Sequence, residues 1–433
     1  FKITFGLANL EPRLGVNSSW HIFLSLFNIK IHKIQTIYFL SSIIHAILIY
    51  EVFLNRKNVF ELSNLFLIFS IFFILIFAII HPFGNGTIYY LLGSPENDSV
   101  VMCYFIITIY LFLKLIKNEK KNLEYLNLII LFSILAALSK LSHLSLVLVP
   151  LILIIAFKFS KVFTKINILA SVLFFFMMIR SIILSGCIFF PVAKTCFQSL
   201  FWGLPISDVD TAGKIYKSFA RDTHLREKWT DFEHTLYSYD WFYPWLADHV
   251  LNTSFFIIFF LLILVSILFY SISIILKLDN NYKVKNLSIF FYTIFILYFC
   301  TFIIWFQSPA IRYAYGPFVS LSSICLSTII YKKYSNFILK FKLFLNYKMV
   351  ILSVLICLGL LVFKNKSNFQ LISSIPNKNE KPVKILFLEQ INGEKFYASY
   401  SCGYFLGICV TEPNLKYKVT KKNNYLFFSR IKR

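Results

Sequence analysis

The fold of this chain is decided by an apolar stretch that follows a short polar loop. Residues 94–117 read SPENDSVVMCYFIITIYLFLKLIK, and from Val100 onward the stretch contains no acid. A helix needs about 17–25 apolar residues to cross the hydrocarbon core of a bilayer. Because backbone groups there can be satisfied only internally, an apolar run of this length predicts a membrane-spanning helix.

Similar apolar runs recur along most of the chain. Hydrophobic residues make up 58% of the sequence and charged residues 15%, against about 45–50% and about 25% in soluble domains. We therefore predict an all-α polytopic membrane protein with about ten transmembrane helices. They are expected near 34–54, 61–80, 100–117, 124–139, 145–159, 165–186, 251–277, 287–306, 316–331 and 349–364.

The net charge of +23 is distributed as short basic clusters between the apolar runs. No basic stripe interleaved with aromatic residues is present, which argues against a nucleic-acid partner. Clusters such as Lys120-Lys121 and Lys332-Lys333 fall in alternate connections, and lysine-rich loops are typical of the cytoplasmic side. The other connections and both ends of the chain are then exoplasmic, in a bacterial inner membrane.

This topology divides the chain into five parts. We expect a first exoplasmic loop at 1–33 with an interfacial helix at 17–28, transmembrane helices at 34–186 and 251–364, a large exoplasmic loop at 187–250, and a small β-rich exoplasmic domain at 365–433. The turn signal Asn392-Gly393 predicts a hairpin in the last part. The chain begins with Phe1 and is interpreted as a fragment that lacks its true N-terminus.

Four cysteines fall as two close pairs in segments expected to be exoplasmic, Cys187 with Cys196 and Cys402 with Cys409. Disulfides persist on the oxidising side of the membrane, so both pairs are predicted to be bonded, with free thiols as the alternative. Neither pair has a second pair or a histidine at ligand spacing, and no metal site is predicted from them.

Charged residues near the exoplasmic ends of helices are the candidates for chemistry. Asp98 and Glu96 could bind a metal or handle a proton, while helix capping is the alternative role for Asp98. Arg180, Arg312 and Lys140 could together bind a lipid phosphate. The alternative for Arg180 is that its side chain extends to the interface.

Three tryptophans of the large loop, Trp202, Trp241 and Trp245, are candidates for stacking on a sugar or an isoprenoid. Trp241 and Trp245 are separated by one helical turn. Anchoring in the membrane interface is the alternative, because tryptophan is enriched there.

The opening of the chain carries a family resemblance. Its motif is Gly6-Leu7-Ala8-Asn9-Leu10 followed by Arg13-Leu14-Gly15-Val16-Asn17-Ser18-Ser19-Trp20. It resembles the first exoplasmic loop of a group of bacterial membrane proteins that are themselves similar to the GT-C superfamily of glycosyltransferases. The superfamily has a catalytic acid in this loop, whereas residues 1–33 contain only Glu11, and we expect the equivalent residue in the missing N-terminal part.

The resemblance implies a membrane enzyme that transfers a sugar from a polyprenyl-phosphate donor to a cell-surface glycan or a lipid-linked acceptor. No cofactor is definitely implied, and a divalent cation is the one candidate. A transporter or flippase of lipid-linked glycans, or a polymerase of them, is the alternative. A transporter would favour polar residues at mid-membrane, whereas this chain concentrates its polar residues outside the apolar runs.

Overall fold

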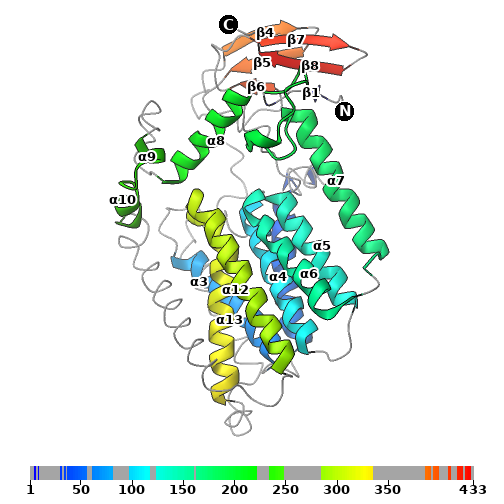
Figure 1. Ribbon diagram of the computed structural model, residues 1–433, viewed down its shortest axis with the longest axis vertical. Coiled ribbons are helices and arrows are strands. Elements are labelled where there is room, and N and C mark those ends of the chain that lie inside the picture. Colours follow the sequence, from blue (N-terminus) through cyan, green and yellow to red (C-terminus); the bar gives the residue numbers. More distant parts are fainter. Residues whose placement is uncertain are drawn as a thin grey trace.

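The computed structural model describes most of the helical part of the chain and the strands near its two ends (Figure 1). The described residues are 4–5, 8, 30–31, 34–35, 37–55, 61–80, 97–117, 123–159, 162–221, 234–247, 284–334, 386–391, 394–398, 408–410, 417–422 and 425–430. Helices dominate them, as the apolar runs predicted.

A helical bundle forms the body of the molecule (Figure 1). Its members are α2 (Ile37–Leu54), α3 (Leu62–Ile80), α4 (Asn97–Lys117), α5 (Leu123–Ser139), the 3₁₀ helix η6 (Leu141–Val147), α6 (Leu148–Phe157), α12 (Val284–Gln307) and α13 (Tyr315–Tyr334). The central element is α4, which packs against α2, α3, α5, α12 and α13. Phe105 and Phe112 of α4 are fully buried, as expected for a helix that is apolar on every face.

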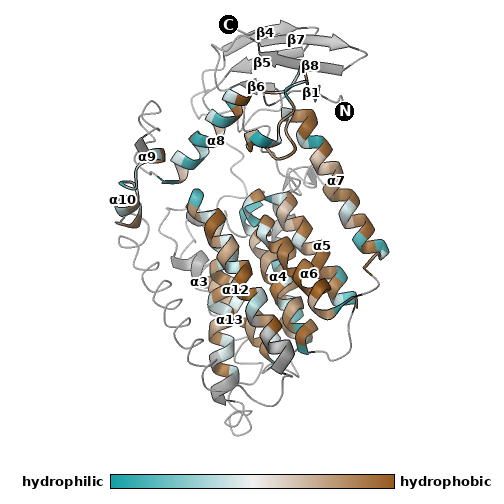
Figure 2. Cartoon of the chain, in the orientation of Figure 1, coloured by the Kyte–Doolittle hydropathy of each residue, from teal (hydrophilic) through white to brown (hydrophobic). Residues whose placement is uncertain are grey.

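A second long apolar helix, α7 (Lys165–Ser185), packs on α5 along the edge of the bundle (Figures 1 and 2). It begins where the Thr164 side chain accepts a hydrogen bond from the Asn167 backbone, and Asn167 Nδ2 donates to Asn127 Oδ1 of α5 at 2.8 Å. Only 11% of the apolar stretch of this helix is buried inside the protein. Phe175 and Phe176 are each 61% exposed.

The described helices agree in position with eight of the ten predicted spans. Two of them, α4 and α7, are both long and apolar enough to cross a membrane. One predicted span, 145–159, is shortened, since a 3₁₀ segment occupies 141–147 and the α-helix runs only over Leu148–Phe157. The predicted spans at 251–277 and 349–364 and the predicted helix at 17–28 lie outside the described residues.

One end of the bundle faces a small strand-containing region, and we call this end the sheet end (Figure 1). Here β1 (Thr4–Phe5) pairs in parallel with β8 (Tyr425–Arg430), which pairs with β7 (Tyr417–Lys422). A second sheet has the order β4 (Leu386–Ile391), β5 (Glu394–Ala398), β6 (Ile408–Val410), and β2 (Lys30–Ile31) pairs with β3 (Ile34–Gln35). The β4–β5 hairpin lies where Asn392-Gly393 predicted it, whereas the pairing of β1 with β8 was not predicted.

Between these sheets and the bundle lie η7 (Ala193–Thr195) and most of α8 (Ile206–Arg221), in the first part of the predicted large loop (Figure 1). The later part of this loop contains α9 (His234–Tyr237) and α10 (Phe242–Leu246), which lie beside the bundle, at the left of Figure 1. A small core in the first part joins Cys187, Phe190, Leu204, Val209 and Ala212 to Ala8 of the opening motif. Ala8 of the opening motif therefore packs against the segment that follows α7.

Candidate functional site

An ion pair stands at the sheet end of the central helix. Asp98 lies in the first turn of α4, and Lys140 lies between α5 and η6. Lys140 Nζ contacts Asp98 Oδ1, with only 14% and 11% of the two side chains exposed. Beside the pair, Asn97 Nδ2 donates a hydrogen bond to the Ser139 carbonyl oxygen at 2.8 Å. The start of α4 and the end of α5 are thus joined by two polar contacts.

A third element closes over this pair. The connection between α12 and α13 contains the 3₁₀ helix η10 (Ile311–Ala314), and Lys140 Nζ lies 3.8 Å from the centroid of the Tyr313 ring. The ammonium group is therefore held between a carboxylate and the negative face of an aromatic ring, and both stabilise its positive charge. The backbone of Arg312 lies in the same turn.

A polar layer continues into the bundle below the pair. His143 of η6 is 3% exposed, its ring meets Phe105 of α4 edge-on at 5.9 Å, and its Nδ1 lies 3.0 Å from Ser142 Oγ. Ser145 Oγ hydrogen-bonds Thr301 Oγ1 at 2.7 Å. Sequence reasoning missed this layer, since isolated histidine and serine residues in apolar runs give no signal of which side they face.

Trp245 of α10 and Trp241, which precedes this helix, pack on the end of α12 and on the connection that follows it. Trp245 Nε1 donates to the Pro309 carbonyl oxygen at 3.0 Å, and its ring packs on Trp305 at 5.7 Å. Trp241 packs on Phe306 at 5.8 Å. Trp241 and Trp245 are only 5% and 7% exposed, so in this structure their rings contact the protein itself.

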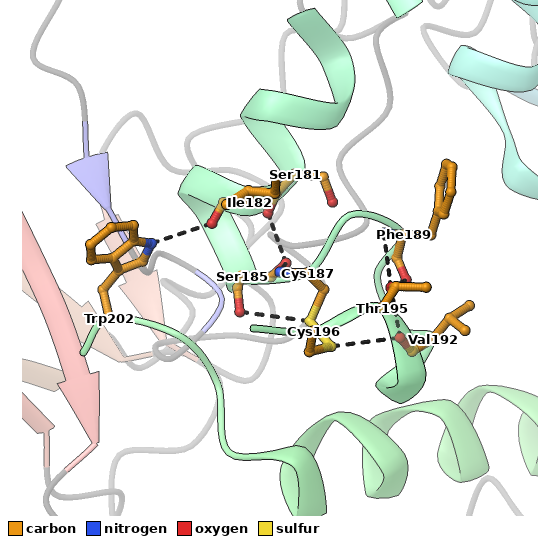
Figure 3. The surroundings of a disulfide bond; sticks show 9 residues. All are labelled: Ser181, Ile182, Ser185, Cys187, Phe189, Val192, Thr195, Cys196 and Trp202. Atoms are coloured by element: carbon orange, nitrogen blue, oxygen red, sulfur yellow. Dashed lines mark hydrogen bonds between the residues drawn. A yellow bond between two sulfur atoms is a disulfide. The ribbon is translucent and has the colours of Figure 1, made fainter. Parts of the chain in front are cut away.

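The disulfide between Cys187 and Cys196 is present, as predicted, and closes the loop that follows α7 (Figure 3). Trp202 lies beside this loop, half-buried, and its Nε1 donates to the Ile182 carbonyl oxygen at 3.3 Å. The bond predicted between Cys402 and Cys409 involves a residue outside the described part, although the Cys409 backbone pairs with Tyr397 between β6 and β5.

Of two further charged candidates, Arg180 lies within the part of the chain that the structure describes and Glu96 does not. Arg180 lies in the last turns of α7 and is half-buried. Within the part of the chain that the structure describes, no group of three or more His, Cys, Asp or Glu side chains could hold a metal ion. The single described carboxylate of the site, Asp98, is paired with Lys140.

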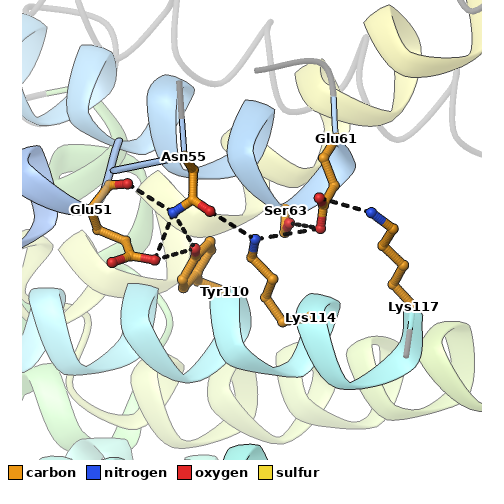
Figure 4. A network of polar contacts seen from close by, with 7 residues as sticks. All are labelled: Glu51, Asn55, Glu61, Ser63, Tyr110, Lys114 and Lys117. Atoms are coloured by element: carbon orange, nitrogen blue, oxygen red, sulfur yellow. Dashed lines mark hydrogen bonds and ion pairs between the residues drawn. The ribbon is translucent and has the colours of Figure 1, made fainter. Parts of the chain in front are cut away.

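A second polar cluster, not predicted from the sequence, lies at the opposite end of α4 (Figure 4). Tyr110 Oη and Asn55 Nδ2 each donate to Glu51 Oε1 at 2.7 Å. Lys114 Nζ donates to Asn55 Oδ1 at 3.3 Å. The end of α2 is thereby joined to the second half of α4.

The same cluster includes the residue that precedes α3. Glu61 lies 2.8 Å from Lys117 Nζ and 3.5 Å from Lys114 Nζ, and it accepts a hydrogen bond from Ser63 Oγ at 2.8 Å. Burial by itself raises the pKa of the Glu61 carboxyl, but the hydrogen bonds from Lys117 and Ser63 and the two lysine charges lower the pKa below its ordinary value of 4.5. Glu61 is therefore ionised at neutral pH.

A family model described as a domain of unknown function, DUF8201, matches residues 1–319. The chain belongs to this family. The matched range contains the opening motif, the Asp98–Lys140 pair, the disulfide loop and Tyr313, and it ends within α13. Neither the curated proteins nor the solved structures contain a match to this chain.

Proposed function

We propose that this chain is a membrane-embedded glycosyltransferase of the GT-C type, with about ten transmembrane helices, in a bacterial inner membrane. It transfers a sugar from a polyprenyl-phosphate donor to a cell-surface glycan or a lipid-linked acceptor. The observation that carries the proposal is the largely buried Asp98–Lys140 pair under Tyr313 at one end of the central helix. A general base and a cation for a phosphate are thereby brought into one small region.

The membrane location is supported most directly by α7. Its 21 residues form a regular helix that is largely apolar between Lys165 at its start and Arg180 near its end, and the rest of the chain covers little of it. Removing one phenylalanine side chain from water is worth about 1.5–3 kcal/mol, and α7 exposes Phe175, Phe176 and several aliphatic side chains. In a lipid bilayer these side chains would not be exposed to water, and this free energy would be gained.

The orientation is supported by the gathering of three segments at the sheet end. The strand β1, the disulfide loop and the strands β7 and β8 all lie there (Figure 1). Lys114 and Lys117, in the last turn of α4, belong to the opposite end. Disulfides form on the oxidising side and basic clusters remain in the cytoplasm, so the sheet end is assigned to the exoplasm.

The chemistry follows from these two groups. The oxygen of the acceptor hydroxyl forms a bond to the anomeric carbon of the sugar, while the bond from that carbon to the phosphate oxygen breaks. Asp98 takes the hydroxyl proton, and the bonding electron pair leaves with the polyprenyl phosphate, whose added charge Lys140 stabilises. Arg180 and Arg312 are assigned to the same phosphate, Glu96 to the acceptor side and Trp202 to the sugar.

Free polyprenyl phosphate is the product common to every donor sugar, so its release tests the proposal without knowledge of the sugar. The full-length protein in nanodiscs is incubated with a panel of polyprenyl-phosphate hexoses and a membrane extract as the source of acceptor. We expect release by the wild type and by the exposed-acid variant Asp210→Asn, and loss of release in Asp98→Asn. No release with any donor, or an unchanged rate in Asp98→Asn, would refute the proposal.

A second candidate function is translocation of a lipid-linked glycan, and the cluster around Glu51 and Glu61 favours it. Partly buried charges at both ends of one central helix are compatible with alternating exposure of a charged headgroup. A flippase moves its lipid without breaking the bond to the sugar. Transfer of a fluorescent lipid-linked glycan across liposomes, with no free polyprenyl phosphate, would select this function.

A further inference from the structure

An exposed aromatic surface lies on the segment 234–247, outside the candidate site. Tyr237, Tyr239 and Tyr243 are 75%, 78% and 72% exposed, and Phe242 is 40% exposed. Exposed aromatic rings concentrated in so short a segment are unusual for a surface that meets only water, and such patches mark interaction sites. We call these four side chains the aromatic surface.

The opposite side of the same segment is fixed to the bundle. Trp245 is hydrogen-bonded to Pro309 and packs on Trp305, and Trp241 packs on Phe306. The Arg221 guanidinium at the end of α8 lies 5.0 Å from the centroid of the Trp241 ring. The segment is thus held on both sides of Trp241, and its outward tyrosines are displayed from a fixed support.

The aromatic surface continues an exposed apolar face of α12. Tyr292, Phe295, Phe299 and Phe302 recur every three or four residues along this helix and are 69%, 69%, 56% and 54% exposed. Phe302 contacts Trp305 and Phe306, on which α10 packs. The apolar face of α12 therefore leads directly to the aromatic surface, which lies at the level of the sheet end of α12 (Figures 1 and 2).

We propose that α9 and α10 form an anchor that lies on the exoplasmic leaflet, with the aromatic surface in contact with the lipid headgroups. The proposal rests on the membrane location of α12, but not on glycosyl transfer. Tyrosine has an apolar ring and a polar tip, which suits the boundary between hydrocarbon and water. The segment contains no Lys or Arg, so aromatic partition rather than attraction to anionic lipids stabilises the contact, and zwitterionic lipid suffices.

This anchor sets the depth of the candidate site. The Pro309 carbonyl oxygen that accepts from Trp245 belongs to the connection that carries Tyr313 over Lys140. A segment fixed at the headgroups would hold the Lys140 ammonium close to the level where a lipid phosphate lies. The partner recognised is the lipid surface itself.

The test measures depth in the membrane by fluorescence quenching. p-Azidophenylalanine replaces Tyr239 in the full-length chain, a small fluorophore is attached through the azide so that the cysteines stay unmodified, and the protein is placed in phosphatidylcholine nanodiscs. Quenchers are a headgroup nitroxide, a nitroxide deep in the acyl chains, and aqueous iodide. Matched probes replace Phe299, expected deep in the lipid, and Thr211, an exposed residue of α8 expected in water.

We expect the Tyr239 probe to lose most of its fluorescence to the headgroup nitroxide and little to iodide, with no change at high salt. A Tyr239 probe that behaves like the Thr211 probe would refute the anchor and leave the surface to a soluble partner, such as a glycan or a second copy of the chain. A Phe299 probe that the deep nitroxide does not quench would refute the membrane location of α12. Loss of transferase activity alone would change none of these readings.

Discussion

The Asp98–Lys140 pair gives the sharpest energetic prediction. Asp98→Asn keeps the shape of the side chain but leaves the Lys140 ammonium, 14% exposed, without its carboxylate. Removing one partner of a buried pair costs about 3–5 kcal/mol. Because some solvent and the Tyr313 ring still reach the ammonium, we expect the free energy of unfolding to fall by about 2–3 kcal/mol, at or slightly below the lower limit of that range.

Removing the lysine instead of the carboxylate is expected to lower the free energy of unfolding by less. Lys140→Met leaves Asp98 in the first turn of α4, where the helix dipole stabilises a negative charge by about 0.3–1 kcal/mol. The double variant Asp98→Asn/Lys140→Met leaves no unpaired charge. Its loss should therefore be smaller than the sum of the two single losses, by a coupling of about 1–3 kcal/mol, as for residues in direct contact.

Steric-trap or SDS unfolding of the purified full-length chain measures the four free energies of unfolding that this cycle needs. The exposed pair Asp210 and Lys214, which lie 2.8 Å apart on α8, provides the matched control. The cycle Asp210→Asn/Lys214→Met should show no measurable coupling, since solvent screens exposed pairs. If Asp98 and Lys140 prove additive, or couple no more strongly than the control, the reasoning from their burial is wrong.

The remaining predictions concern the two ends of the bundle. Gly186 has φ +80°, and a Cβ there would lie 2.6 Å from Gly203 Cα, so Gly186→Ala should lower the free energy of unfolding by about 2–4 kcal/mol. Thermal unfolding should show a smaller loss for Gly213→Ala, whose Cβ would meet its nearest atom only at 3.3 Å. The stabilisation from Glu61 should be complete above the ordinary carboxyl pKa of 4.5 and be lost as the pH falls through the lower pKa of the folded state. Glu61→Gln should flatten this acid limb of the stability profile, and an unchanged slope would contradict the pKa assignment.

The apolar runs predicted where the helices lie because hydrophobicity along a chain is a local property. The stretch from Val100 to Lys117 became α4, which begins three residues earlier, at Asn97. The extra turn is accompanied by the hydrogen bond from Asn97 to Ser139, a contact between residues far apart that no local pattern reveals. The proximity of Asp98 and Lys140 followed from topology, since both fall in short connections on the same side.

The contacts that could not be predicted from the sequence depend on how the helices rotate about their axes and pack against one another. Glu51 and Glu61 appear in the sequence as ordinary acids near helix ends, and their contacts with Tyr110 and Lys114 exist only once α2, α3 and α4 are packed together. The sequence likewise gave no sign that two residues at the start of the chain, Thr4 and Phe5, pair with β8. Pairing of such distant and short segments is decided by the folded body that brings them together.

The placement of polar contacts at both ends of α4 has a mechanical consequence. Asp98 and Lys114 are sixteen residues apart on one helix, so the two clusters stand roughly 24 Å from one another at 1.5 Å per residue. Because α4 is held by polar contacts at both ends, it resists sliding along its axis. Such a movement would break the contacts of Glu61 and of Asp98 at the same time. An opening toward the proposed sugar donor would then involve elements at the perimeter of the bundle, and α7, which the rest of the chain covers little along most of its length, is the helix best placed to move.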